Sequence, residues 1–319
     1  MMVINGVAAD RCDFTVSGVV VKNTSSYIYL GSPFTENGKM NDVIKLHVKS
    51  RMKDLNKFKI FCRKNETMPF QFKNKVLMAA IISSLLYGCE SWITDNLKDV
   101  EKIYISAVKS LLGVRETTRS DTVLLEAGMP SVKQLVVKRT SAFLKKEMRA
   151  ERASETPLRK ILSICEAKGT GGYRFLSNII NPAGRNDRTP AQDFEGQLGS
   201  KAVTYRSINP TLSVHKAYTS TDYIDERERL TFTRFRLSSH HLKIETGRWA
   251  RLNLEDRVCG CGTGIQDESH VLLRCAKTEE VRRRFDVRVE EYFDFGDMMD
   301  SMDVHNLVSF VYNCMKMFG

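Results

Sequence analysis

The sequence predicts a mainly α-helical protein with a small β region at its N-terminus and a small helical domain at its C-terminus. Three observations predict this fold class. β-Branched and aromatic residues gather between turn signals in residues 1–36, and apolar residues recur at three- and four-residue steps over much of 37–150 and 226–319. Residues 151–225 carry repeated Gly and Pro turn signals, so we expect a linker with sparse helix there.

The composition is that of a globular protein with a basic surface. Of 319 residues, 42% are hydrophobic and 27% charged, which excludes a disordered chain. The net charge of +11 favours an anionic partner, nucleic acid before membrane. The first ten residues lack the features of a signal peptide. The longest uncharged apolar run, 76–89, is too short to cross a bilayer. We therefore expect an intracellular protein of the nucleus or cytoplasm, without membrane contact.

Three short runs near the N-terminus predict β-strands. They are Val3-Ile4 before the turn signal Asn5-Gly6, the run from Phe14 to Val21 that Gly18 interrupts, and residues 27–30 before Gly31-Ser32-Pro33. Three strands of this length cannot build an independent core. Residues 1–36 are therefore expected to be the end of a larger domain, or an edge that pairs with another protein.

Helical periodicity begins after Asn37-Gly38 and continues to about residue 64. The expected apolar face consists of Ile44, Val48, Met52, Leu55, Phe58 and Cys62. Lysines recur every four residues on another face, at Lys45, Lys49, Lys53 and Lys57. A lysine row can be an ordinary solvated helix face, but few acidic residues are spaced to pair with this one. We therefore expect these lysines to lie along the phosphates of a nucleic acid.

Further helices are expected up to residue 150. The run 76–86 is apolar on all sides, which is typical of a buried core helix. A third helix, 97–111, should stop at Gly113. Two more are expected to begin at the N-cap residues Asp121 and Ser131.

Arginine and aromatic residues are interspersed after the linker. The linker itself should hold one short helix, 156–167, and the helix predicted over 224–242 alternates arginines with Phe232 and Phe235. Arginine beside aromatic rings can clamp phosphate and stack on bases. An amphipathic helix that buries its aromatic residues would explain the same pattern. The candidate nucleic-acid contacts of this region are Arg234, Arg236, Arg248, Trp249 and Arg251.

Cys259, Cys261, His270 and Cys275 form a cluster with the spacing C-x-C-x₈-H-x₄-C. Three thiols and one imidazole suit tetrahedral Zn²⁺, and a closed set of four ligands is typical of a structural site. The other cysteines are scattered, which favours a reducing compartment over a disulfide framework. Positions 270 and 275 lie about 140° apart on an ideal helix, so a helix here must begin at or after His270 or be irregular. The alternative is a group of ordinary reduced cysteines beside a surface histidine.

Two blocks of the sequence resemble the reverse transcriptases of non-LTR (LINE-type) retrotransposons. The first block, 27–92, contains Tyr29-Leu30-Gly31-Ser32, the lysine-rich helix and the string Leu86-Tyr87-Gly88-Cys89-Glu90-Ser91-Trp92. The second contains Phe235-Arg236-Leu237-Ser238-Ser239-His240 and Glu245-Thr246-Gly247-Arg248-Trp249, followed by the cysteine-histidine cluster. The resemblance implies the end of a palm over 1–36, a thumb-like helical domain over 37–150, and a zinc-knuckle-like region, stapled by Zn²⁺, within 226–319.

The resemblance also implies which parts of such a polymerase are missing. The palm aspartates that would hold Mg²⁺ lie upstream of the first block in this family, as does an endonuclease. The string Tyr223-Ile224-Asp225-Glu226 follows the thumb-like segment and lies in an apparently helical setting, so it is not expected to replace them. We found no glycine-rich phosphate loop and no Ser-His-Asp set. We therefore expect no catalytic residues and no Mg²⁺ site in this chain.

The resulting hypothesis is a truncated reverse-transcriptase fragment without autonomous polymerase activity. It would bind RNA or an RNA/DNA duplex, and it could act together with an intact reverse transcriptase in trans. Two alternatives stay open. The chain could be a protein-interaction module with a purely structural zinc site, or the C-terminal part of a longer, active RNA-directed DNA polymerase whose start was misassigned.

Overall fold

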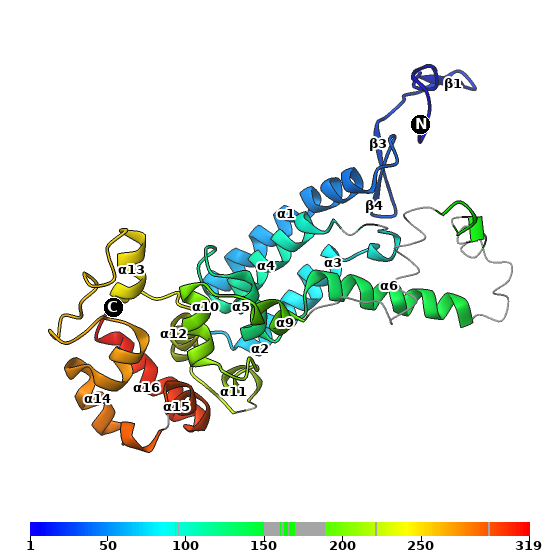
Figure 1. Ribbon diagram of the computed structural model, residues 1–319. Helices are drawn as coiled ribbons and strands as arrows, with labels where there is room; N and C mark the ends of the chain where they lie inside the picture. Colours follow the sequence, from blue (N-terminus) through cyan, green and yellow to red (C-terminus); the bar gives the residue numbers. More distant parts are fainter. Residues whose placement is uncertain are drawn as a thin grey trace. The chain divides into compact units, whose positions relative to one another are not determined.

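The computed structural model describes residues 1–92, 94, 96–149, 160, 163–164, 166–169, 189–220, 222–292 and 294–319. Helices account for most of these residues, and the strands form two hairpins near the N-terminus (Figure 1). The predicted fold class, mainly α with a small N-terminal β region, is confirmed. Among the described residues, no helix has both the length and the apolar character needed to cross a membrane.

The chain divides into two compact units, each made of three segments. Unit 1 consists of Met1–Lys57, Met78–Tyr104 and Pro130–Asp187. Unit 2 consists of Phe58–Leu77, Ile105–Met129 and Arg188–Gly319. The predicted domain boundaries after positions 36, 150 and 225 were drawn from changes in composition along the chain, whereas the two units group residues that lie close in space. The predicted boundaries therefore stay predictions.

Each N-terminal hairpin turns on a two-residue loop with positive φ at both positions. In β1 (Phe14–Val16) and β2 (Val19–Val21) the loop is Ser17-Gly18, with φ of 51° and 79°. In β3 (Ser26–Tyr29) and β4 (Ser32–Thr35) it is Leu30-Gly31, with φ of 47° and 83°. Such loops match the twist of paired strands and require residues that tolerate the left-handed conformation.

The hairpins correct three details of the expected strands. Gly18 is a turn residue rather than an interruption, so residues 14–21 form two strands instead of one. Ser32 and Pro33, expected in the turn that closes the third run, instead begin β4, in which Pro33 pairs opposite Ile28. Val3-Ile4 forms no strand, although Asn5 does lie in a turn with φ of 58°. A short 3₁₀ turn, η1 (Ala8–Asp10), precedes β1.

The core of unit 1 forms along one face of α1 (Met40–Lys64). Ile44 and Leu55 are buried, but Met52, expected on the same face, is 44% exposed. His47, which the periodicity did not predict in the core, is buried, and its ring donates from Nε2 to the carbonyl of Leu85 at 2.9 Å. Burial lowers the pKa of His47, so the ring packs as a neutral donor.

One side only of the apolar run 76–86 is buried. The segment is a continuous helical stretch of α2 (Phe70–Val76), the π-helix η2 (Leu77–Ile82) and α3 (Ser83–Leu85). Met78 and its two alanine neighbours at 79 and 80 are exposed, so the expected all-round burial is wrong. Small alanines expose little apolar area, and for this reason an apolar run need not be buried on every side.

The remaining helices up to position 149 follow their predicted positions closely. After the 3₁₀ turn η3 (Cys89–Ser91), α4 (Lys98–Leu112) ends at Gly113, which has φ of 66° as expected. α6 (Val132–Arg149) begins after Ser131, whose hydroxyl accepts from the Gln134 amide at 3.2 Å. α5 (Ser120–Ala127) begins one residue before Asp121, so the expected N-cap at Asp121 is wrong.

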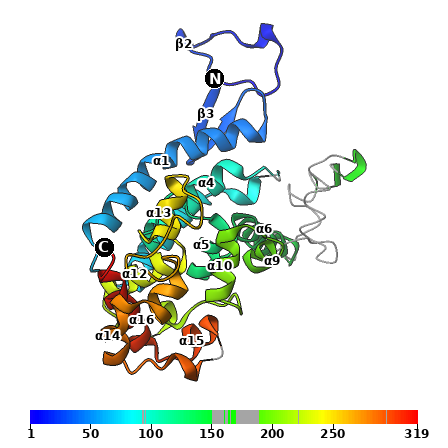
Figure 2. The same ribbon diagram turned by 60° about the vertical axis from the view of Figure 1, so that its left-hand side comes forward.

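Unit 2 is built from short helices around α12 and α16, which lie side by side (Figure 2). The helices from position 190 onward are α9 (Pro190–Glu195), α10 (Ser200–Ile208), α11 (Lys216–Thr219), α12 (Glu226–Arg236), α13 (Lys243–Trp249), η5 (His270–Arg274), η6 (Ala276–Thr278), α14 (Glu279–Arg284), η7 (Val289–Glu291), α15 (Phe295–Ser301) and α16 (Val304–Lys316). Phe232 and Phe235 of α12 pack with Leu307 and Phe310 of α16 in one buried cluster. Most of the predicted helix 156–167 lies outside the described residues.

Candidate metal centre and basic surfaces

The four predicted ligands converge in unit 2. The ligand atoms of Cys259, Cys261, His270 and Cys275 all lie within 4.8 Å of one another. Sγ of Cys259 is 3.7 Å from Sγ of Cys275, and Sγ of Cys261 is 3.2 Å from Nε2 of His270. Two thiolates bound to one tetrahedral Zn²⁺ would lie about 3.8 Å apart. The group could therefore hold one metal ion, and its spacing is compatible with zinc.

A tight hairpin places the first two cysteines. An isolated bridge pairs Val258 with Ile265, and the Cys259 amide donates to the Gly264 carbonyl at 2.9 Å. Gly262 and Gly264 have φ of 84° and 77°, which a residue with a side chain would adopt only with strain. The glycines thus allow the chain to reverse within a few residues and to turn both sulfurs toward one point.

An irregular helix that begins at His270 places the other two ligands, in agreement with the possibilities that the sequence left open. Residues His270–Arg274 form the π-helix η5, and the Cys275 amide donates to the His270 carbonyl at 2.8 Å. This bond spans five residues and widens the turn relative to an α-helix. The Asp267 carboxylate accepts from the His270 amide at 2.7 Å and fixes the start of the turn. The wider turn brings residues five positions apart to the same side.

The two ends of the cluster differ in their electrostatics. The hydroxyl of Thr263 donates to Sγ of Cys261 at 3.2 Å and lowers the pKa of that thiol to about 5. Burial raises the pKa of Cys275 to about 11. The thiolate is the form that binds a metal ion, and a bound cation stabilises it. Cys261 is therefore prepared for a metal ion, whereas Cys275 would lose its proton when the ion binds.

Sequence reasoning missed three polar side chains near the cluster in the chain or the fold, of which Gln266 contacts a ligand directly. Gln266 accepts from the Lys243 amide at the start of α13 at 2.8 Å and donates to Sγ of Cys259 at 3.7 Å. Glu268 is buried and meets Nε2 of His240 at 2.9 Å. The only sequence signal was that Gln266 and Glu268 lie within four residues of His270. Partners such as Gln266 commonly orient metal ligands.

The lysine row on α1 is exposed along its whole length. Lys45, Lys49, Lys53 and Lys57 all lie in unit 1 and are exposed. Lys45 is 3.4 Å from Asp42. Within the described part of the chain, no ion pair is found for the other three lysines. The row therefore keeps most of its charge available.

The arginine-aromatic region is only partly exposed, and one expected nucleic-acid contact in it is wrong. Arg236 is 1% exposed and its Nε lies 2.6 Å from Oε1 of the buried Glu126, so it cannot contact a nucleic acid. Phe232 and Phe235 are fully buried, so the alternative of an amphipathic helix that buries its aromatic residues is correct for α12.

Other members of this region remain accessible. Arg234 and Arg251 are exposed, and Trp249 is 47% exposed. Arg248 is half-buried and pairs with Glu245. The guanidinium carbon of Arg115 lies 4.0 Å from the centre of the Trp249 ring. Trp249 is thus a fixed aromatic ring beside a cation.

The acidic string at the start of α12 has structural partners. The Asp225 carboxylate caps the helix by accepting from the amides of Arg227 and Glu228 at 2.9 and 3.2 Å. Glu226 is 3% exposed and is paired with Arg229 at 2.6 Å and with Lys73 at 3.1 Å. These contacts account for both carboxylates.

No known protein-family model matches this chain, and no curated protein sequence matches it. The resemblance to non-LTR reverse transcriptases therefore depends on the two blocks of residues quoted above.

Proposed function

We propose that this chain binds nucleic acid through its thumb-like and C-terminal regions, as a relative of the C-terminal part of non-LTR reverse transcriptases without polymerase activity of its own. The observation that carries the proposal is the exposed lysine row on α1. Four-residue steps on a helix rise roughly 6 Å and turn roughly 40° beyond a full circle. The row thus follows a curved path of roughly 18 Å, long enough to lie along several phosphates of a strand.

The surface around Trp249 supports the same proposal for unpaired bases. Arg115 covers part of the ring, and the exposed remainder can stack on a base. Arg251, two residues further on, is exposed and can meet a phosphate. This region would hold a single strand or a structured RNA, and the lysine row would hold the backbone of a duplex.

We further propose that the metal ion is Zn²⁺ and that its role is structural. Four protein ligands leave no position for a substrate. The zinc loop is tied to α13 because Lys243 Nζ donates to the Val258 carbonyl at 2.8 Å and Arg257 donates to the Ile244 carbonyl at 3.0 Å. Zinc would therefore hold the segment that positions Trp249.

Binding of the full chain to a labelled RNA hairpin across a salt series tests the proposal. We expect log Kd to depend linearly on log salt concentration. Replacing Lys45, Lys49, Lys53 and Lys57 by Ala should reduce the slope by up to about 3.6, since each of the four phosphate contacts contributes about 0.9.

The matched control removes four exposed lysines of α6, namely Lys133, Lys138, Lys145 and Lys146. This control changes the net charge by the same amount as the α1 variant. If the lysine row is the binding surface, the control should change the slope much less. Absence of binding at low salt, or the same slope change in both variants, would contradict the proposal.

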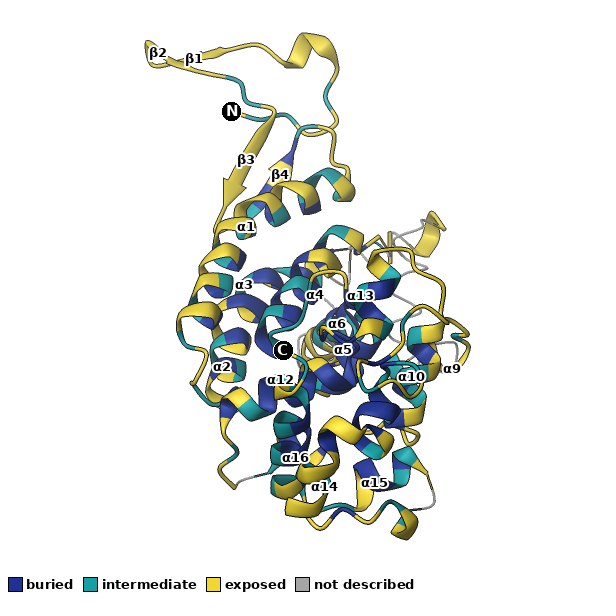
Figure 3. Cartoon of the chain, turned by 90° about the vertical axis from the view of Figure 1, so that its left-hand side faces the viewer, coloured by how far each residue is buried: buried dark blue, intermediate teal, exposed yellow. Residues whose placement is uncertain are grey.

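A second candidate function is a protein-interaction module, favoured by the exposed hairpins of unit 1. Val16, Val19 and Ile28 are 60%, 66% and 67% exposed, and Figure 3 shows β1, β2 and β3 as exposed over most of their length. A strand edge with apolar side chains can pair with a strand of another protein.

Replacing these three residues by Thr keeps the preference for strand and removes apolar area. If the hairpins bind a protein, a stoichiometric partner that survives nuclease treatment should be lost from the triple variant and kept by the lysine variant. A partner that nuclease releases, or that the triple variant retains, would exclude this function.

A further inference from the structure

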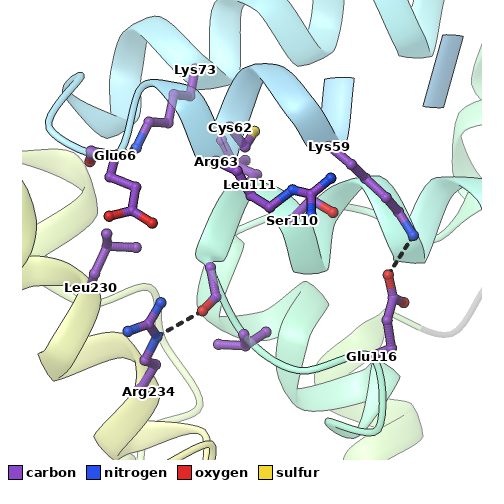
Figure 4. A pocket seen from close by; sticks show the side chains of 12 residues that line it. Lys59, Cys62, Arg63, Glu66, Lys73, Ser110, Leu111, Glu116, Leu230 and Arg234 are labelled. Carbon is purple, nitrogen blue, oxygen red and sulfur yellow. Dashed lines mark hydrogen bonds and ion pairs between the residues drawn. The ribbon is translucent and has the colours of Figure 1, made fainter. Parts of the chain in front are cut away.

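A cavity of about 350 Å³ lies in unit 2, and its lining includes neither the four metal-ligand residues nor the four lysines of the row. Its walls come from the C-terminal end of α1, the end of α4 with the loop that follows, and α12 (Figure 4). The volume lies near the lower end of the range of about 300–1,000 Å³ that is typical of small-ligand sites.

Two guanidinium groups supply the unbalanced charge of the cavity. Arg63 of α1 and Arg234 of α12 come from opposite walls. No carboxylate pairs with either of them among the residues that the structure describes, and Arg234 uses only its Nε, toward the Gly113 carbonyl at 2.8 Å. The guanidinium group of arginine binds phosphate and carboxylate groups through bidentate hydrogen bonds.

The other cations of the lining already have partners. Lys59 pairs with Glu116 at 2.6 Å, and the buried Lys73 pairs with Glu226 at 3.1 Å. Glu66 is the remaining acid of the lining. The two arginines therefore exceed the acids by one positive charge, which favours an anion.

The apolar part of the lining gives the cavity its shape. Leu111, Val114 and Leu230 lie beside the charged groups. Gly113 has φ of 66°, and a Cβ there would lie only 2.6 Å from Cδ2 of Leu230. The loop and α12 therefore approach closely at a position that only glycine allows, and the apolar wall is held in place.

We propose that this cavity binds a nucleoside monophosphate group. Arg63 and Arg234 would hold the phosphate, which carries a charge of about −1.5 to −2 at neutral pH. The leucine and valine side chains would contact the base or the sugar, and the Glu66 carboxylate could accept a hydrogen bond from a sugar hydroxyl. The same group could come from a free nucleotide or from the 5′-phosphorylated end of a strand.

Calorimetric titration of the full chain with adenosine 5′-monophosphate tests this proposal. We expect a Kd below about 1 mM at low salt. Arg63→Ala should raise the Kd at least tenfold, because it removes charge-assisted hydrogen bonds. Arg63→Lys should have an intermediate effect, because an ammonium group keeps the charge but cannot form the bidentate hydrogen bonds.

The matched control is Lys64→Ala. Lys64 is the next residue of α1, is exposed and does not line the cavity, so the Kd should change less than twofold. Undetectable binding of adenosine monophosphate, equal binding of adenosine without phosphate, or equal effects of the two alanine variants would overturn the proposal.

Two further ligands identify the source of the nucleotide. A 5′-phosphorylated trinucleotide that binds more tightly than adenosine monophosphate, with the same sensitivity to Arg63→Ala, assigns the cavity to a strand end; equal or weaker binding assigns it to free nucleotide. A mononucleotide is too small to span the lysine row. Loss of nucleotide binding with intact RNA binding would thus refute only this proposal, and the reverse result only the proposed function.

Discussion

The buried pair of Glu126 and Arg236 shows why single residues of α12 were misread from sequence. On α12, Arg229, Phe232 and Arg236 follow steps of three and four residues and are all buried. The periodicity was therefore visible, but arginines on a buried stripe are rare unless they are paired. The partner lies 110 residues away in the sequence, so no local pattern could predict it.

Removal of one member of this pair should strongly destabilise unit 2. Arg236→Ala leaves the Glu126 carboxylate buried, and we expect a loss of about 3–5 kcal/mol in the free energy of unfolding. The double variant Glu126→Ala, Arg236→Ala should lose less than the sum of the single variants. Urea unfolding of the four proteins measures this coupling. Additive losses would show that the pair contributes no interaction energy.

The same pair predicts the direction of acid destabilisation. Burial alone would raise the pKa of Glu126, but Arg236 and the donating hydroxyls of Tyr205 and Tyr218 lower it below its usual value. Its contribution is therefore complete above the unfolded pKa of about 4.3 and is lost as the pH falls through the lower pKa of the folded state. In the double variant Glu126→Ala, Arg236→Ala, the free energy of unfolding should therefore fall less steeply with decreasing pH than in the unchanged protein, as urea unfolding at a series of pH values would measure.

At the scale of elements, the sequence predicted best where two independent signals agree. α4 has both an apolar period and a terminal glycine, and the observed end at Leu112 matches the prediction. The second hairpin was missed because its turn at Leu30-Gly31 places a leucine at positive φ, which composition does not indicate. The run 76–86 has no polar stripe, so its exposed side could not be located.

The metal cluster was predicted from spacing alone, and its geometry required an element that sequence rules describe poorly. A π-helix has no distinctive residue preference, yet η5 is what aligns His270 with Cys275. The ligands could be named because cysteine and histidine are chemically distinctive. Gln266, which contacts Cys259, and the buried Glu268 are ordinary polar residues, and only the folded chain shows what they contact.

At the scale of the whole molecule, the two units should respond differently to removal of the metal ion. Metal binding at a closed site contributes directly to folding, so chelation should unfold the segment around 255–280. Because Gln266 and the Val258 carbonyl hydrogen-bond to Lys243 at the start of α13, this loss of structure should extend to α13. The helices of unit 1 contain none of the four ligands, so their amides should stay protected against hydrogen exchange.

Hydrogen exchange and native mass spectrometry, each before and after chelation, measure these changes. We expect one zinc ion per chain, faster amide exchange around 255–280 and in α13 after its removal, and little change in α6. Cys261→Ser should produce the same pattern without chelator. A chain that carries no metal at neutral pH, or exchange that is identical before and after chelation, would refute the structural zinc site. Recovery of protection when Zn²⁺ is returned, but not with Mg²⁺, would link the folding of this segment to its sulfur ligands.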